Sequence, residues 1–261
     1  MPCECRQKKG EPHKADQTAS INFHGLMVLV KKIMHYDGKY ILPLNTVYEL
    51  STYLKIKKMN SNHLPKLIHV NITEFCTNII LEFIPFSFSF FFSVQLPCEF
   101  IELKINELIK AVNLLHSKNI AHRDIKSANI RFLSDSSLVL IDFDSASPTQ
   151  KRTSLPMCTL NTRAPELIQL QYESVDKNYD AFACDWWSVG CILAEMFLGS
   201  CLFEANNETH PTIVLCAIKS FCEKLHSEKG VEPLKRRMPS HLYSLLQHLL
   251  EMNPTKRFLG E

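Results

Sequence analysis

The sequence lacks any block of charge of one sign. Its 261 residues carry 29 Lys and Arg against 27 Asp and Glu, a formal net charge of +2, and the basic residues are scattered along the chain. Nucleic acids and anionic membranes are bound by concentrated positive charge, and nothing in this balance demands either of them. We therefore expect no nucleic-acid partner and no membrane partner.

Paired metal-binding cysteines and an apolar leader are also missing. None of the ten cysteines forms a CxxC pair. Six of them lie among apolar residues, which favours buried free thiols over a metal site. These six are Cys158, Cys184, Cys191, Cys201, Cys216 and Cys222. Residues 1–10 are polar and charged where a signal peptide is apolar, so we expect localisation in the cytoplasm or nucleus.

One long segment, residues 79–96, is nearly free of charge and approaches the length that crosses a bilayer. Glu82, Pro85 and several serines within it argue against a membrane span. We expect a buried strand followed by a packed aromatic segment.

The hydrophobic content of 46% is enough for one large domain or for two lobes. In the first part of the chain, short apolar runs predict strands and one segment of helix formers predicts a helix. The strands are expected over 28–33, 67–70 and 78–83, and the helix over 46–57. Together these elements predict a small, mostly β lobe.

The pattern changes from Cys98 onward. Apolar residues recur every three or four positions, which lines one face of a helix. They are Ile101, Ile105, Leu108, Ile109, Val112 and Leu115. Residues 186–198 are apolar almost all round, as in a fully buried helix, and residues 242–250 predict another helix. The sequence thus predicts an α+β fold with a helical second part.

Three side chains with oxygen ligands occur close together in the second part. Asp124 and Asn129 lie on one short loop, and Asp142 follows the strand-like residues 138–141. A hairpin in this region would bring all three together.

These residues belong to a longer ordered set of motifs. The set comprises Lys31, Glu49, His122-Arg123-Asp124, Lys126, Asn129, Asp142-Phe143 and Ala164-Pro165-Glu166. In order and spacing it resembles the eukaryotic protein kinases of the serine/threonine type. The resemblance covers nearly the whole chain and implies a bilobal kinase domain over residues 1–261. The small β-rich N-lobe would span residues 1–84, and the larger helical C-lobe, C-terminally short, residues 85–261.

The resemblance implies a role for each motif residue in phosphoryl transfer from ATP to a protein substrate. Asp124 would accept or orient the proton of the substrate hydroxyl, and Lys126 is the residue typical of serine/threonine specificity. Asn129 and Asp142 would bind Mg²⁺.

The resemblance also implies a nucleotide site. Lys31, paired with Glu49, would grip the phosphates of ATP. The backbones at Glu82 and Ile84 would face adenine, and Leu81 would control access to the pocket behind the adenine ring. Only Gly10 remains of the expected glycine-rich loop, over residues 5–10.

The resemblance also implies how the chain would be regulated and which residue would line the pocket for the substrate hydroxyl. Arg123 would pair with a phosphate on the activation segment, at Ser154 or alternatively at Thr153. Thr159 would hydrogen-bond Asp124 and Lys126.

Three further residues are expected to hold the second lobe together. Asp185 would anchor the backbone of the loop that carries Asp124, the alternative being a helix cap. Glu166 would pair with Arg257, because a buried carboxylate without that arginine is strongly penalised.

Two functions remain open. The motif set favours an active kinase, whereas the degenerate glycine-rich loop, Leu29 and Asp144 favour a pseudokinase or scaffold. Asp144 stands where the family has glycine, tolerates a left-handed backbone and offers a further metal contact.

The more specific resemblance is to cyclin-dependent kinases and to the cell-division-cycle kinase that triggers replication origins. The latter likeness rests on a short path from Glu82 to His122 and a longer link between Lys14-Ala15 and Val28. It implies an activating regulatory subunit and a role in cell-cycle control or signalling.

Overall fold

The computed structural model describes residues 17–23, 26–35, 44–88, 95–148, 151–152, 158–170, 178–206 and 208–258. The chain divides into two compact units. The first contains the described residues before 42 together with Ile68–Phe83, and the second contains Pro43–Leu67 and Ile84–Glu261. The predicted α+β class, with a β-rich part and a larger helical part, is confirmed.

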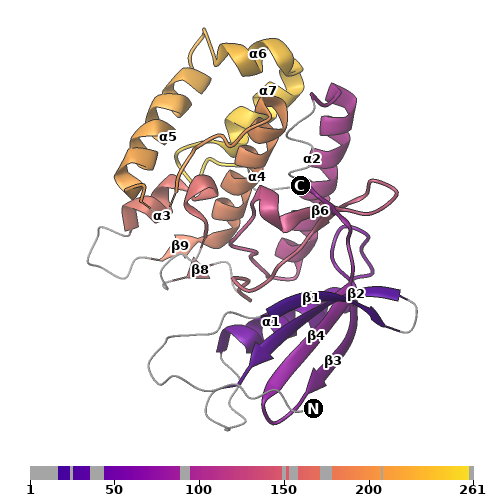
Figure 1. Ribbon diagram of the computed structural model, residues 1–261. Coiled ribbons are helices and arrows are strands. Elements are labelled where there is room, and N and C mark those ends of the chain that lie inside the picture. The colour runs from indigo at the N-terminus through magenta and orange to yellow at the C-terminus, as the bar shows by residue number, and fades with distance from the viewer. Residues whose placement is uncertain are drawn as a thin grey trace. The chain divides into compact units, whose positions relative to one another are not determined.

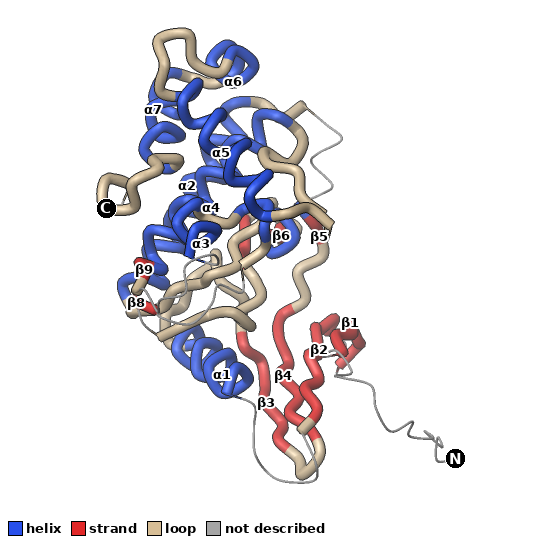
Figure 2. The backbone as a smooth tube through the Cα atoms, turned by 90° about the vertical axis from the view of Figure 1, so that its left-hand side faces the viewer, coloured by secondary structure: helices blue, strands red, loops and turns tan. Residues whose placement is uncertain are grey.

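The first unit is built on a four-stranded sheet of order β1-β2-β4-β3 (Figures 1 and 2). Its strands are β1 (Gln17–Phe23), β2 (Leu26–Met34), β3 (Leu67–Ile72) and β4 (Cys76–Glu82). The antiparallel register of β2 and β4 places Lys31 opposite Ile79 and Leu29 opposite Leu81. All three strands expected from the apolar runs are present.

Strand β1 corrects one expectation, because the sequence predicts only a link between Lys14-Ala15 and Val28. Instead, β1 pairs with β2 along its whole length, from Gln17 opposite Lys32 to Phe23 opposite Leu26. The side chains of residues 18–22 are all exposed. With neither face buried, the strand carries no apolar alternation by which to recognise it.

Helix α1 (Leu44–Lys57) matches the expected helix but lies in the second unit, although residues 1–84 were expected to form the first lobe. Its packing explains the difference. The ring of Tyr53 meets that of Phe143 edge-on, with centroids 5.4 Å apart. The carbonyl of His63, after the helix, accepts a 3.0 Å hydrogen bond from the amide of Leu140.

The second unit is mainly helical (Figure 1). Its longer helices are α2 (Cys98–Ser117), α4 (Ala181–Leu198), α5 (Pro211–Leu225) and α7 (Ser240–Leu249). Its short helices are η2 (Ser127–Asn129), η3 (Leu160–Thr162), α3 (Pro165–Leu170) and α6 (Glu232–Arg237). Its short strands are β5 (Phe86–Ser87), β6 (Ile130–Phe132), β7 (Leu138–Leu140), β8 (Lys151–Arg152) and β9 (Tyr179–Asp180).

Helix α4 forms the centre of this unit, with α2 and α7 packed on it. Asp180 caps it by accepting hydrogen bonds from the amides of Phe182 and Ala183. Gly190 permits the close approach of α7, since a Cβ there would lie 2.8 Å from Leu250 Cδ2. Among the described helices, α4 alone has the length and apolarity of a membrane span, but 89% of it is buried within the protein, as in a core helix.

The cysteines mostly follow the prediction of buried free thiols. Cys158, Cys184, Cys191 and Cys222 are buried, and burial raises the pKa of each thiol. Cys201 is half-buried, and the prediction was wrong for Cys216, which is exposed. The buried face of α5 is formed by Val214, Ile218, Cys222 and Leu225. Cys216 does not lie on that face.

The apolar segment from residue 79 begins, as predicted, with a buried strand. Ile79, Ile80 and Leu81 of β4 are all buried. Phe88 is also buried and stacks on Phe132, with centroids 6.2 Å apart. Residues 89–94 lie outside the described part.

Candidate active site

The loop between α2 and η2 is fixed through the carboxylate of Asp185. Its Oδ2 accepts a 2.8 Å hydrogen bond from the amide of His122, and its Oδ1 accepts one of 2.8 Å from the amide of Arg123. His116 Nε2 donates to the same Oδ2 over 2.9 Å. Asp185 therefore anchors the loop as predicted, and the alternative of a helix cap is excluded because Asp180 caps α4.

Two residues of the site have left-handed backbones that side-chain-bearing residues rarely adopt. The φ angles are 69° at Arg123 and 68° at Asp142. Such conformations persist where surrounding contacts hold them, and they concentrate at functional sites. Asp185 holds the amide of Arg123, and His122 Nε2 donates a 3.1 Å hydrogen bond to the carbonyl of Ile141, next to Asp142. Both strained residues are thus tied to the same loop.

The carboxylate of Asp124 collects hydrogen bonds from three side chains. Thr159 donates to Oδ1 from its hydroxyl at 2.9 Å and from its amide at 3.0 Å. Lys126 Nζ lies 2.7 Å from Oδ2 and also donates to the Thr159 hydroxyl over 2.9 Å. Asn129 Nδ2 donates to Oδ2 over 3.2 Å and to the carbonyl of Asp124 over 2.9 Å. The expected contacts of Thr159 with Asp124 and Lys126 are both present.

These contacts determine the charge of Asp124. Burial raises its pKa, but the hydrogen bond and the charge of Lys126, with the hydrogen bonds of Thr159, outweigh burial, so the net pKa lies below the ordinary value. The group is therefore an ionised acceptor at neutral pH. It can orient a hydroxyl that approaches it.

A hairpin brings Asn129 and Asp142 together, as the spacing predicted. Strands β6 and β7 pair with Ile130 opposite Leu140, and the amide of Ile141 donates to the carbonyl of Asn129 over 2.9 Å. The ends of the hairpin therefore hold these two residues side by side in the backbone.

Three carboxylates gather beside this hairpin. Oxygen atoms of Glu49, Asp142 and Asp144 all lie within 4.8 Å of one another. Carboxylate oxygens are the ligands that hard divalent cations prefer, so the arrangement fits such a cation. Asp144 accordingly lies where a further metal contact is available.

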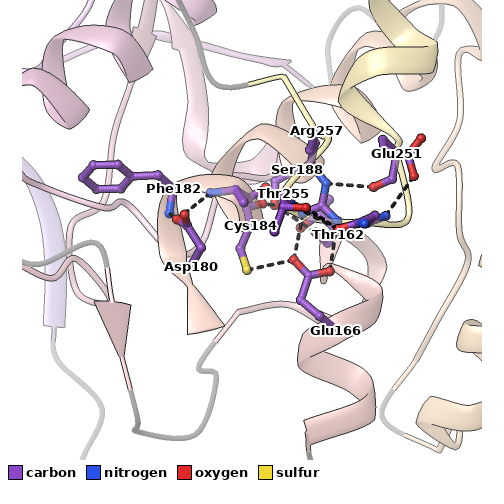
Figure 3. Close-up of polar contacts among 11 residues, drawn as sticks. Thr162, Glu166, Asp180, Phe182, Cys184, Ser188, Glu251, Thr255 and Arg257 are labelled. Atoms are coloured by element: carbon purple, nitrogen blue, oxygen red, sulfur yellow. Dashed lines mark hydrogen bonds and ion pairs between the residues drawn. The ribbon is translucent and has the colours of Figure 1, made fainter. Parts of the chain in front are cut away.

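A buried ion pair joins Glu166 to Arg257, as predicted (Figure 3). Arg257 Nη1 donates to Oε1 over 2.7 Å and Nη2 to Oε2 over 3.0 Å. Nη1 also donates to the carbonyl of Ala183, and the guanidinium lies 5.1 Å from the ring of Trp187. This bidentate geometry connects the first turn of α3 with the C-terminal segment and with α4.

The residues expected at the nucleotide occupy both units. Lys31, Leu81 and Glu82 lie on the sheet of the first unit, with Lys31 and Leu81 buried. Ile84 is in the second unit, where its carbonyl accepts a 3.3 Å hydrogen bond from Arg131 Nη1. Glu49 belongs to the second unit, so its pairing with Lys31 stays a prediction.

Gly10, Thr153 and Ser154 lie outside the described residues. The remnant of the glycine-rich loop and the phosphorylation site that would pair with Arg123 therefore stay predictions as well.

Sequence reasoning missed His116, which supports the site through Asp185. Its ring stacks on Phe182 with centroids 4.0 Å apart while Nε2 reaches the carboxylate. The available signal was its position directly after Leu115, at the end of the apolar face of α2.

Comparison with known proteins agrees with this geometry. The Protein kinase domain family matches residues 22–259. A probable cell division protein kinase of Encephalitozoon cuniculi is 26% identical over 237 residues, which cover 90% of this chain and 84% of that protein. The probable serine/threonine-protein kinase glkA of Dictyostelium discoideum is 38% identical over 133 residues, 50% of this chain. Mitogen-activated protein kinase p38a of Drosophila melanogaster is 27% identical over 186 residues, 64% of this chain.

The match with some of these relatives is only partial in length. The chain spans 27% of glkA and 49% of p38a. The domain match, however, extends over most of the chain and includes the loop, the hairpin and the Glu166–Arg257 pair described above. The chain therefore belongs to the protein kinase family.

Proposed function

We propose that this chain is an ATP-dependent protein kinase that phosphorylates serine and threonine hydroxyls of protein substrates. The observation that carries the proposal is the arrangement at Asp124. Its ionised carboxylate forms an ion pair with Lys126 and accepts a hydrogen bond from Thr159. Phosphoryl transfer depends mainly on positioning and on charge neutralisation, which these residues supply. Family membership and the serine/threonine kinases among the relatives support it.

In the proposed reaction, Asp124 accepts a hydrogen bond from the substrate hydroxyl and takes up its proton as the hydroxyl oxygen bonds to the γ-phosphorus of ATP, while the bond from that phosphorus to the bridging oxygen breaks and ADP leaves. Lys126, 2.7 Å from Asp124, places positive charge where the transferred phosphoryl group carries negative charge. Thr159 fixes the carboxylate from the other oxygen. A carboxylate held on both sides has one orientation, so the hydroxyl that it binds is aligned as well.

We propose Mg²⁺ as the divalent cation. Asn129 and Asp142 would hold it, and Asp144 and Glu49 add oxygen atoms nearby. When bound, the ion neutralises phosphate charge and orients the nucleotide. Lys31, Leu81, Glu82 and Ile84 would contact the nucleotide.

An activating subunit and a cell-cycle role are further parts of the proposal. The relatives include a probable cell division protein kinase and a probable CTD kinase subunit alpha homolog, both from Encephalitozoon cuniculi. We propose a location in the cytoplasm or nucleus, which fits the free thiols of every cysteine in the described part.

A pseudokinase or scaffold is the second candidate. Leu29 lies opposite Leu81 in the β2–β4 register, and by the family resemblance its bulk would narrow the space left for adenine. Asp144 adds a third carboxylate to the cluster. Leu29 would weaken nucleotide binding, as would the added negative charge of Asp144 when no cation is bound, and the site of the substrate hydroxyl at Asp124 would be unaffected.

A thermal-shift series separates the two candidates. The active kinase predicts that ATP raises the melting temperature of the purified chain when Mg²⁺ is present and much less when EDTA replaces it. Asp142→Asn is expected to reduce the Mg²⁺-dependent part, whereas Asp135→Asn, at an exposed turn, is a matched control. Incorporation of labelled phosphate into a serine peptide but not its tyrosine counterpart then establishes the activity. A chain that neither binds ATP nor transfers phosphate would be a scaffold.

A further inference from the structure

An arginine of the helical unit bonds to a residue that the proposed function places at the nucleotide. Arg131 is the middle residue of β6, and its Nη1 donates a 3.3 Å hydrogen bond to the carbonyl of Ile84. Both residues belong to the second unit, whose longer segment begins at Ile84. Neither the motifs of the sequence nor the proposed reaction assigns a role to Arg131.

The side chain of Arg131 is not part of the packing that holds β6 in place. The neighbouring residues Ile130 and Phe132 are 0% and 1% exposed, whereas Arg131 is half-buried. Because side chains alternate between the two faces of a strand, Arg131 lies on the face opposite to these two. Among the described residues, the carbonyl of Ile84 is the only polar partner of its guanidinium.

The backbone at Ile84 belongs to no strand. Strand β4 ends at Glu82, and β5 begins at Phe86. Strand β5 pairs with β6 through Phe86 and Ser87. The hydrogen bond from Arg131 therefore extends the contact of this segment with the β6–β7 hairpin back to Ile84, two residues before the ladder begins.

Pro85 restricts the backbone of Ile84 further. A residue that precedes proline is confined mainly to extended conformations, because the proline ring clashes with helical ones. The carbonyl of Ile84 is in addition held by Arg131. These two restraints act on the same residue, so they also limit the directions in which its own amide can point.

The amide of Ile84 is open to a ligand. No described residue accepts a hydrogen bond from it. Ile84 is only 5% exposed, and a buried amide without an acceptor costs free energy. A buried donor that is held in one direction suits an acceptor atom of a ligand. The ring nitrogens of a purine base are such acceptors.

We propose that Arg131 is a positioning residue of the nucleotide site, which holds the carbonyl of Ile84 so that the amide of the same residue meets the adenine base. The inference rests on the proposed function, in which Ile84 contacts the nucleotide, and it names the residue that supports this contact. Arg131 acts through Ile84 and need not touch the nucleotide itself.

Binding of the separate parts of ATP tests the proposal. The dissociation constants of ATP, adenosine and inorganic tripolyphosphate, each with Mg²⁺, are measured by competition with a fluorescent ATP analogue. Arg131→Met keeps the unbranched part of the side chain and removes its donors. We expect it to weaken ATP and adenosine about fivefold each, the usual effect of one hydrogen bond, and to change tripolyphosphate by less than about twofold.

Further variants show whether the donor is responsible. Arg131→Lys keeps a cationic donor of nearly the same reach and should retain most of the affinity for adenosine. Arg131→Gln, whose amide is two bonds shorter, should behave like Arg131→Met and replaces it if that variant does not fold. Arg236→Met, at an exposed position in α6, is the matched control and should leave all three dissociation constants unchanged. Thermal melting without ligand checks that each variant is folded.

Deaza analogues of adenosine locate the effect at the base. Replacement of N1, N3 or N7 by carbon removes one ring nitrogen that can accept a hydrogen bond. One of the three analogues then lacks the acceptor for Ile84. Arg131→Met should weaken that analogue by less than about twofold and the other two about fivefold. With ATP as substrate, KM should rise about fivefold, and kcat at saturating ATP should change by less than about twofold.

The outcomes separate this inference from the proposed function. Equal adenosine affinities of Arg131→Met and the wild type, a loss that extends to tripolyphosphate, or the same loss for all three analogues would overturn the role of Arg131. In each of these cases the wild type still binds ATP, and the proposed function stands. A wild type that binds neither ATP nor adenosine would overturn both.

Discussion

The hydroxyl of Thr159 lies 2.9 Å from Oδ1 of Asp124, although 35 residues separate them in the chain. The same hydroxyl accepts a 2.9 Å hydrogen bond from Lys126, so one threonine holds both groups proposed to meet the substrate. The relationship ties the activation segment to the loop that carries Asp124. It also makes Thr159 a positioning residue whose role can be measured.

Thr159→Val should lower kcat by about tenfold or more, because it removes a hydrogen bond to a charged group while keeping the shape of the side chain. Thr159→Ser retains the hydroxyl and should keep most of the activity. The pH dependence of kcat distinguishes positioning from simple instability. Loss of the Thr159 hydroxyl should shift the acidic limb of the pH profile to higher pH, since the hydrogen bonds of Thr159 help to lower the pKa of Asp124. Equal activity of the valine and serine variants would contradict this account.

Asp185→Ala should destabilise the protein by about 3 kcal/mol, because the buried amides of His122 and Arg123 lose their acceptor. Urea unfolding followed by tryptophan fluorescence measures the change. Asp135→Ala is the control, since this exposed side chain accepts only a local hydrogen bond from Ser137, and it should change stability far less. Similar midpoints for the two variants would show that Asp185 does not anchor the loop.

Arg257→Ala should cost about 3 kcal/mol or more, since it leaves the carboxylate of Glu166 without its bidentate partner. Arg236→Ala, at an exposed position in α6, should have little effect and serves as the control. The double variant Glu166→Gln with Arg257→Ala should lose less than the sum of the single losses, because no unpaired charge remains. Additive losses would mean that the pair is not coupled.

The buried carboxyl group of Glu195 should make the stability of the folded protein depend on pH. It is 1% exposed, its Oε2 finds no partner among the described residues, and burial raises its pKa to about 7 from an ordinary 4.5. The folded state therefore holds a proton that the unfolded state releases, and stability falls as the pH rises from about 4.5 to about 7. Glu195→Gln should be more stable than the wild type at pH 8, by about 3 kcal/mol, and nearly equal to it at pH 4.5. Unfolding curves across this range check it, and a difference independent of pH would contradict it.

The sequence predicts the local parts of the structure well. The strand of Lys31, the helix of Glu49, the long helix before His122 and the hairpin joining Asn129 to Asp142 all follow from short apolar patterns. Each pattern lies within one element or between neighbours, which is where periodicity carries information.

Contacts between distant segments followed from the family resemblance instead. The hydrogen bond between Thr159 and Asp124 and the ion pair between Glu166 and Arg257 connect residues that no periodic pattern relates. Strand β1 was missed because both of its faces are exposed, and His116 because its partner Asp185 lies 69 residues away. A pocket lined by Asn161, Cys201 and Glu204 among others also escaped prediction, because these residues, about 40 positions apart in the chain, come together only on folding.

The central claim is that Asp124 serves phosphoryl transfer to a hydroxyl. Its most direct test compares the wild type with Asp124→Asn, which keeps the size of the side chain but removes the charge. Both proteins are incubated with labelled ATP, Mg²⁺ and a serine peptide, and their melting curves with and without nucleotide establish equal folding and binding. The account predicts clear incorporation by the wild type and a loss of at least about 100-fold in the variant. Equal incorporation by the two proteins would contradict it.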